Sequence, residues 1–433
     1  MTITGPVEAR AIQRVRRRLI PFLALLYFVA YLDRFNIGFA ALQMNEALGF
    51  SGGVYGFGAG IFFIAYFLFE VPSNLVLSRV GARVWLGRIA IIWGAVSMAM
   101  MFISGPRSFY VMRFLLGAAE AGFFPGVIYY FTFWFPAHER ARAVAQFSMA
   151  SMAAGIIGGP VSGALLSLDG RGGLQGWQWL FIVEGLPAVA LGLVALRYLT
   201  DRPEDARWLP DEEKAWLIET LRRERAQSPH AHAGALRTGL LDPAVWRFAA
   251  ALFFIVTTGY GFSFFLPQIV RRLSGGSDLS VGLLTAIPFA AAAVAMVMVA
   301  ARSDRGGERR RYVVASASVA ALALFASTFA TSAGLSLLLL SIAAMGIYSY
   351  TPVFWSMPTA FLRGDAAAAG IAFINATGNL GGFLGPYLMG WLQDLSGDFL
   401  NGLRVMALAA VVSAMLIVTS RTTLVAAPAR VMG

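Results

Sequence analysis

Residues 19–42 read LIPFLALLYFVAYLDRFNIGFAAL, and this stretch decides how the chain folds. At about 1.5 Å per residue, a helix of this length crosses the roughly 30 Å hydrocarbon core of a bilayer. Four arginines precede the stretch and place its start on the cytoplasmic side: Arg14, Arg16, Arg17 and Arg18. Asp33 and Arg34 interrupt the apolar run two thirds of the way across. Because charges at that depth are costly, the pair either snorkels toward the outer headgroups or, as we favour, faces a water-filled path.

The amino-acid composition is that of a membrane protein, most of whose surface contacts lipid. Hydrophobic residues make up 58% of the 433 residues and charged residues only 13%, whereas soluble domains carry about 25% charged residues. A net charge of +11 would suit nucleic acid, but the basic residues gather on one side of the membrane, which excludes that partner. The chain has no cysteine, and its three histidines show neither metal-ligand spacing nor a catalytic triad. We therefore expect an all-α polytopic membrane protein without metal, cofactor or enzymatic activity.

Twelve apolar stretches of span length follow one another in two groups of six. The first group occupies residues 19–199, at roughly 19–42, 54–77, 84–104, 108–132, 141–167 and 178–199. The second group occupies residues 244–420, at roughly 244–272, 279–301, 312–332, 334–362, 366–394 and 398–420. A basic tail at 1–18, a polar linker at 200–243 and a tail at 421–433 complete the chain. The linker spaces Trp208, Trp216 and Leu221 along one helix face, which predicts one or two amphipathic helices on the membrane surface.

The basic residues lie mainly on one side of these spans. Of the 34 Lys and Arg residues, two (Arg34 and Arg113) lie within spans and five lie in the loops opposite the N-terminus, which leaves 27 on the side of the N-terminus. The five are Arg107, Arg171, Arg271, Arg272 and Arg404. This asymmetry satisfies the positive-inside rule and predicts cytoplasmic N- and C-termini. Lys214 is the single lysine, a usage typical of GC-rich bacterial genomes, so we expect a bacterial plasma membrane.

The two halves repeat each other at an offset of 226 residues. SRVGAR at 78–83, after the second span, corresponds to DRGGER at 304–309, after the eighth. GIIGGP at 155–160 corresponds to GGFLGP at 381–386 by the same offset. Such repeats predict two pseudo-symmetric halves, and transporters built this way bind substrate near the membrane midplane.

The charges inside the spans belong to one half. Arg113 and Glu120 lie seven residues apart, so two helical turns place them on one face of the fourth span, about 10 Å apart along its axis. The offset places Asp33, Arg34, Arg113 and Glu120 on uncharged residues of the second half: Gly259, Tyr260, Leu339 and Gly346. We therefore expect the first half to hold an anionic group and a coupling ion, and the second half to contact the substrate through neutral groups. The alternative is an Arg113 at the outer interface and a structural Glu120.

Four motifs resemble the anion:cation symporter family of the major facilitator superfamily. They are YLDRFNIGFA at 31–40, FEVPSN at 69–74, RFLLGAAEAGFFPG at 113–126 and FIVEGLPA at 181–188, and the resemblance covers nearly the whole chain. It implies the major facilitator fold, with its twelve transmembrane helices, acting as a monomer. It also implies that Asp33 and Glu120 couple protons and that Arg34 and Arg113 bind or couple the anion.

Further site residues come partly from this resemblance. It implies substrate contacts from Tyr66 and Asn375, and Asn379 lies one helical turn from Asn375, although helix–helix hydrogen bonding is the alternative for both asparagines. Tyr31, Tyr260 and Trp355 are further candidates, for which packing or an interfacial belt is the favoured alternative.

The loops after spans two and eight resemble the gating loops of the superfamily. They supply the candidate gating residues Arg79, Arg83, Asp304, Arg305 and Arg309. In the loop after span two, Ser78 occupies the position where the superfamily usually has an aspartate. In the loop after span eight, Asp304 is the aspartate at that position. Glu70 is interpreted as a structural or gating partner for a cytoplasmic arginine, and Glu184 in the sixth span as structural.

The charged residues suggest the exchange of a proton for an anion. A guanidinium is always charged and forks onto a carboxylate, while burial disfavours an ionised carboxylate and a neighbouring arginine favours it. A substrate carboxylate that engages an arginine would therefore free Asp33 or Glu120 to take a proton. We predict a secondary active transporter that imports a small organic anion, namely a sugar acid, a hydroxy-dicarboxylate such as tartrate or an aromatic carboxylate, by proton symport with alternating access. The alternatives are an exchanger or exporter on the same fold, and a non-transporting membrane sensor of an organic acid.

Overall fold

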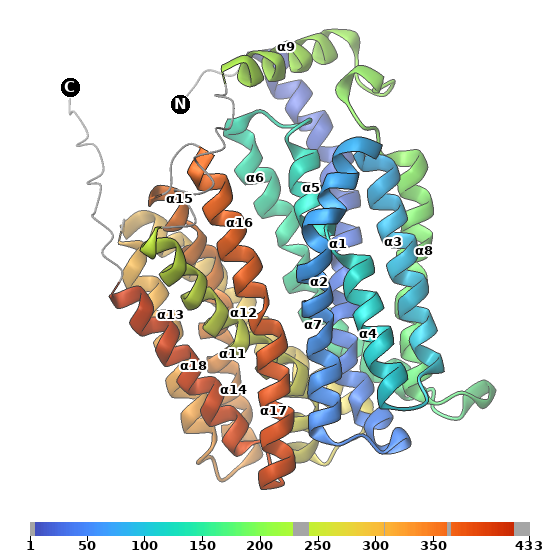
Figure 1. The fold of residues 1–433 in the computed structure, drawn as a ribbon, viewed down its shortest axis with the longest axis vertical. Coiled ribbons are helices and arrows are strands. Elements are labelled where there is room, and N and C mark those ends of the chain that lie inside the picture. Colours follow the sequence, from blue (N-terminus) through green and yellow to red (C-terminus); the bar gives the residue numbers. More distant parts are fainter. Residues whose placement is uncertain (1–4, 228–241, 307, 362–364, 420–433) are drawn as a thin grey trace. The chain divides into compact units, whose positions relative to one another are not determined.

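The computed structural model describes residues 5–227, 242–306, 308–361 and 365–419, and Figure 1 shows it as a ribbon. Every regular element in these ranges is a helix. The helices before the linker are α1 (Pro6–Leu48), α2 (Gly52–Val80), α3 (Ala82–Ala99), η1 (Met100–Phe102), α4 (Pro106–Glu120), α5 (Phe123–Phe131), α6 (Ala137–Ser148), α7 (Ala150–Leu166), η2 (Arg171–Gly173) and α8 (Gly176–Tyr198). The linker contains η3 (Pro203–Asp205) and α9 (Asp211–Gln227). The remaining helices are α11 (Pro243–Ser274), α12 (Asp278–Gly306), α13 (Arg309–Ser327), α14 (Ala333–Trp355), α15 (Pro358–Phe361), α16 (Asp365–Asn379), α17 (Gly381–Ser396) and α18 (Leu400–Val418).

Ten helical stretches of the described residues are long and apolar enough to cross a membrane. Two further segments complete the predicted twelve. α13 carries three arginines at its start, residues 309–311, which lower its hydropathy. The eleventh segment is divided at Leu380 into α16 and α17. The predicted all-α fold with twelve membrane-spanning segments is therefore confirmed.

The described residues divide into two compact units, while the predicted halves at 19–199 and 244–420 stay a prediction. The first unit contains residues 1–50, 61–230 and 276–286, and the second contains 51–60, 231–275 and 287–433. Within the second unit, the start of α2 is held by Asp394 of α17, which accepts hydrogen bonds from the N–H groups of Gly52 (2.7 Å) and Gly53 (2.8 Å). Within the first unit, Gln43 donates to Asp278 of α12 over 2.8 Å. The N-terminal ends of α2 and α12 thus belong to a different unit from the rest of each helix.

α1 is much longer than its apolar stretch. It begins at Pro6, so most of the predicted basic tail at 1–18 is helical, and Pro6 suits a first turn because its missing N–H has no helical partner there. Arg10 and Arg14 of this part pair with Glu212 and Glu213 of α9, which lies across the end of α1 (Figure 1). Arg14 donates to Glu213 over 2.8 Å, and Glu224 accepts from the N–H of Ala137 at the start of α6 over 3.0 Å. The linker helix is therefore fastened to α1 and α6, while its place on a membrane surface stays a prediction.

Candidate functional site

An ion pair inside the first unit joins α1 to α4. Arg34 donates to Glu120, and their side chains are only 11% and 3% exposed. A guanidinium that is this deeply buried needs a carboxylate partner, because an unpaired buried charge is strongly destabilising. The structure thus pairs Arg34 with the carboxylate of another helix and not with its chain neighbour Asp33.

Aromatic rings surround the guanidinium of Arg34. Its central carbon lies 4.8 Å from the ring centre of Tyr31, 5.4 Å from that of Phe62 and 5.7 Å from that of Tyr66. The fully buried Arg113 lies 5.0 Å from the same Phe62 ring. Cation–π contacts of this kind strengthen when the groups are removed from water. Two arginines, a carboxylate and two tyrosines of the predicted site are therefore gathered around one phenylalanine.

Glycines of α4 and its end bring these groups together. A Cβ on Gly117 would lie 2.1 Å from the backbone oxygen of Phe62, so only glycine permits this approach of α2 and α4. The helix then stops at Glu120, and Gly122 takes a positive φ of 87° before α5 begins. Pro125, which can kink a helix, instead sits in the first turn of α5, where its missing N–H costs no hydrogen bond. Glu120 consequently occupies the last turn before a break in the fourth span.

Asp33 faces α3. Its carboxylate accepts hydrogen bonds from Nε1 of Trp93 (2.7 Å), Oγ of Ser97 (2.8 Å) and Nδ2 of Asn36 (3.3 Å). All three donors are neutral, and Asp33 is 1% exposed. Asp33 and Arg34 thus have different hydrogen-bond partners, and whether they face a water-filled path stays a prediction.

The predicted site residues of the second unit are Tyr260, Trp355, Asn375 and Asn379. Tyr260 of α11 packs with its ring centre 5.4 Å from that of Phe264, and Trp355 contacts Phe354. Asn375 and Asn379 are half-buried on α16. Near Tyr260, Ser263 and Tyr348 share a hydrogen bond of 2.8 Å.

Two of the predicted gating arginines, Arg83 and Arg309, lie in the first turns of α3 and α13. The N–H of Arg83 donates to Asp201 over 2.8 Å, and its side chain lies 3.7 Å from the same carboxylate. Arg309 lies 4.0 Å from Asp304 and donates to the carbonyl oxygen of Ser356 over 3.3 Å. Asp201, which follows α8, thus supplies the carboxylate that Ser78 lacks. Arg79 and Arg305 are exposed in the last turns of α2 and α12, and Glu70 is half-buried within α2.

Several residues of these environments were missed from the sequence. Phe62, Trp93, Ser97 and Asn36 are apolar or neutral, so a search for charges inside spans does not select them. A weak signal exists, because Trp93 and Ser97 lie one turn apart and Asn36 lies one turn from Asp33. A buried indole N–H also requires an acceptor, which Asp33 supplies.

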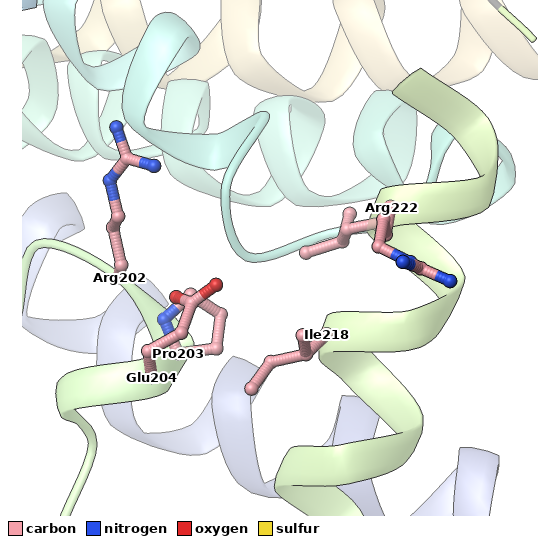
Figure 2. A pocket seen from close by; sticks show the side chains of 6 residues that line it. Arg202, Pro203, Glu204, Ile218 and Arg222 are labelled. Carbon is pink, nitrogen blue, oxygen red and sulfur yellow. The ribbon is translucent and has the colours of Figure 1, made fainter. Parts of the chain in front are cut away.

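A cavity of about 140 Å³ lies elsewhere, between η3 and α9 (Figure 2). Its lining residues are Arg202, Pro203, Glu204, Ile218, Leu221 and Arg222. Figure 2 shows the guanidinium groups of Arg202 and Arg222 pointing in different directions, so they do not converge on one anion. None of the predicted site residues lines this cavity.

Apolar spans that bury arginines and carboxylates are typical of membrane transport proteins. The chain belongs to the Major Facilitator Superfamily, whose family model matches residues 23–386 and 249–430. It is 51% identical, over 97% of both chains, to a protein of Agrobacterium vitis provisionally named a tartrate transporter. It is 43% identical to a quinolone resistance transporter of Acinetobacter baumannii, over 92% of this chain and 91% of that protein. The crystal structure of a bacterial homologue of the human lysosomal transporter Spinster shares the fold, with a TM-score of 0.72 at 19% identity over 93% of this chain and 95% of that one.

Proposed function

We propose that this protein is a secondary active transporter that imports a small organic anion by proton symport with alternating access. The proposed substrates are sugar acids, hydroxy-dicarboxylates such as tartrate, and aromatic carboxylates. The observation that carries the proposal is the buried ion pair of Arg34 and Glu120, next to which lie the rings of Tyr31 and Tyr66. This pair supplies an anion-binding guanidinium and a proton-accepting carboxylate in one place. The provisional name of the A. vitis relative favours a hydroxy-dicarboxylate.

The proposed cycle begins with an exchange of partners at Arg34. A substrate carboxylate takes the place of Glu120 on the guanidinium, because both present the same pair of acceptor oxygens. Glu120, now without its cation in a low-dielectric site, binds a proton from the aqueous side. The empty pair is neutral, and so is the loaded set of Arg34, substrate carboxylate and protonated Glu120. Neither state therefore carries an uncompensated charge at this pair when the transporter reorients.

The other site residues take supporting roles in this proposal. Arg113 binds the second carboxylate of a dicarboxylate, and Asp33 is a separate proton-coupling group. The neutral part of the substrate contacts the aromatic and amide side chains Tyr31, Tyr66, Tyr260, Trp355, Asn375 and Asn379. The proposed gating residues are Glu70, Arg79, Arg83, Asp304, Arg305 and Arg309. We propose a monomer in the bacterial plasma membrane with both termini cytoplasmic.

Uptake into proteoliposomes tests this function. Labelled organic acids are presented to wild type and to Glu120→Gln, with and without an acidic exterior. The wild type should accumulate one class of acid only under the gradient, and Glu120→Gln should retain exchange of that acid but lose accumulation. Glu204→Gln, which removes an exposed carboxylate of η3, is the matched control. Wild-type uptake that equilibrates regardless of the pH gradient would exclude proton symport.

A second candidate function is export of an organic acid by proton antiport. The name of the A. baumannii relative, a quinolone resistance transporter, favours this alternative. The same vesicles distinguish the two, because an acidic exterior drives substrate inward by symport and outward by antiport. Depletion of preloaded acid under that gradient would favour the exporter.

A further inference from the structure

Asp33 of α1 is held by two donors of α3 and by one donor of its own helix. Nε1 of Trp93 donates to Oδ2 of Asp33 over 2.7 Å. Oγ of Ser97 donates to Oδ1 over 2.8 Å, and Nδ2 of Asn36 donates to the same Oδ1 over 3.3 Å. All four side chains are at most 1% exposed, so a hydrogen-bond partner for a proton on this carboxylate has to come from its neighbours.

The two donors of α3 are held in place by the close packing of α3 against α8. A Cβ on Gly94 would lie 2.8 Å from the backbone oxygen of Gly185, and a Cβ on Gly185 would lie 2.9 Å from that of Gly94. Contacts this short leave no room for a side chain at either position, so the two helices touch along their backbones. Trp93 and Ser97, next to Gly94 and one turn after it, therefore donate from a helix with little freedom to shift.

The two oxygens of Asp33 differ in what their donors can do when a proton arrives. An indole N–H can only donate, whereas a serine hydroxyl both donates and accepts. A proton on Oδ2 that points at Trp93 would place two donors face to face. A proton on Oδ1 can point at Oγ of Ser97, which then accepts, while the second lone pair of Oδ1 still accepts from Asn36. All three hydrogen bonds then persist, and only one of them changes direction.

The hydroxyl proton of Ser97 has another acceptor within its own helix. Serines inside helices can donate to the carbonyl oxygen four residues earlier, which for Ser97 is that of Trp93. Two other serines of this chain form this bond: Ser263 donates to the carbonyl oxygen of Gly259 over 2.7 Å, and Ser341 donates to that of Leu337 over 2.7 Å. The reversal at Ser97 thus needs the rotation of one hydroxyl and no movement of a helix.

We propose that Asp33 takes its proton on Oδ1 and donates it to Ser97, while Trp93 stays bonded to Oδ2 in both states. One O–H bond forms on Asp33 with a proton from the aqueous side, and Ser97 keeps its own proton. Trp93 favours the ionised form, because a hydrogen bond to a charged carboxylate is stronger than one to a neutral acid, whereas Ser97 supports both forms. Both are positioning residues for Asp33. The choice of oxygen does not depend on transport, but its part in uptake rests on the proposed proton symport.

Charged groups of the neighbouring helices also act on Asp33. They are Glu120 and Arg113 of α4 and Glu184 of α8. Neutral replacements of Trp93 and Ser97 leave all three of these charges in the protein. A difference between such variants therefore reports on the hydrogen bonds to Asp33.

Infrared titration of the reconstituted protein tests the proposal without transport. The carboxylic acid band that Asp33→Asn removes is followed against pH in the wild type, Trp93→Phe and Ser97→Ala. Trp93→Phe should move the midpoint of this band to higher pH by about one unit or more, since it removes a donor that favours the charged form. Ser97→Ala should move the midpoint much less, because both forms lose a partner. Trp85→Phe is the matched control, since this indole of the same helix donates to Ser73 over 3.0 Å, and it should leave the midpoint unchanged.

Two infrared results would overturn the proposal. Equal shifts in Trp93→Phe and Ser97→Ala would show that Ser97 is a fixed donor. A wild type without a titrating band that Asp33→Asn removes would show that Asp33 takes no proton. If Trp93→Phe does not fold, Ser97→Ala decides alone, because a fixed donor requires a shift of about one pH unit or more and a reversing hydroxyl does not.

The pH profile of substrate uptake tests the link to transport. The profile should shift in Trp93→Phe and stay close to that of the wild type in Ser97→Ala. An infrared shift in Trp93→Phe without a change in the uptake profile would mean that Asp33 does not couple protons to transport. The proposed role of Asp33 in symport would then fail, while the assignment of the proton to Oδ1 would stand.

Discussion

Arg34 and Glu120 form an ion pair between α1 and α4, although the carboxylate next to Arg34 in the chain is that of Asp33. Successive residues of a helix point about 100° apart, so the two neighbours meet different helices. One carboxylate is held by a guanidinium and the other by three neutral donors. Substitutions at the two positions should therefore have different consequences.

Arg34→Lys should weaken substrate binding although it keeps the positive charge. An ammonium is a point charge and does not offer the planar fork that matches a carboxylate. Loss of one hydrogen bond to a charged group costs about 1.5–3 kcal/mol, which predicts a rise in KM or Kd of roughly ten- to a hundredfold. The measurement is substrate binding to the purified protein. Arg107→Lys, at an exposed position outside the site, should bind as wild type does.

Gly122→Ala should destabilise the protein for two reasons. The residue has a φ of 87°, and a Cβ there would lie 2.3 Å from Oγ of Ser73. The left-handed backbone costs about 1–2 kcal/mol, and overpacking adds about 1–3 kcal/mol. Gly173→Ala is the matched control, because Gly173 has a φ of 74° but open space around it. Thermal unfolding should show a larger decrease in stability for Gly122→Ala than for Gly173→Ala. Equal decreases would mean that the close contact with Ser73 does not contribute to the destabilisation.

Glu213→Gln should loosen α9. Glu213 is 3% exposed and receives two hydrogen bonds from Arg14, at 2.8 Å and 3.3 Å. Because Arg14 is half-exposed, the loss is about 1 kcal/mol and not that of a fully buried pair. Hydrogen exchange of the α9 amides should therefore accelerate about fivefold. Glu219→Gln is the control, because it removes only exposed ion pairs within α9. It should leave the hydrogen exchange of the α9 amides that pack against α1 unchanged. An equal acceleration in both variants would contradict the role of Glu213 in holding α9 to α1.

The spans could be predicted because lipid imposes a length of apolar residues that few other structures need. Residues 19–42 show the limit of that argument, since α1 extends to Pro6 and Leu48 through ion pairs with α9 and a C-terminal glycine cap. Hydropathy contains no information on such contacts. The break at Gly122 was likewise missed, because the sequence marks Pro125 as the kink and does not show which glycine takes a positive φ.

The sequence indicates which charged residues lie inside the spans but not which of them contact each other. Arg34, Arg113 and Glu120 stand out because charges are rare inside spans. Which arginine meets which carboxylate depends on the rotation of each helix about its axis, and spacing along one helix does not determine that rotation. The neutral donors Trp93 and Ser97 were missed for the same reason.

The last prediction concerns the charge difference between the two repeats. Asn375 lies half-buried on α16, and the second half is uncharged at the positions that correspond to the four charges of the first. If Asn375 contacts an anionic substrate, Asn375→Asp places like charges together, and such contacts cost several kcal/mol. The KM for uptake should then rise at least about tenfold, since each 1.4 kcal/mol corresponds to a factor of about ten.

Two further variants separate charge from the loss of a hydrogen bond. Asn375→Ala removes the amide without adding charge, and its effect on KM should be smaller than that of Asn375→Asp. Asn401→Asp adds the same charge at an exposed position, where Arg404 already donates to the side chain over 3.2 Å, and should leave KM unchanged. Equal KM values for Asn375→Asp and Asn375→Ala would mean that no anionic part of the substrate comes near α16, so that Asn375 serves only helix packing.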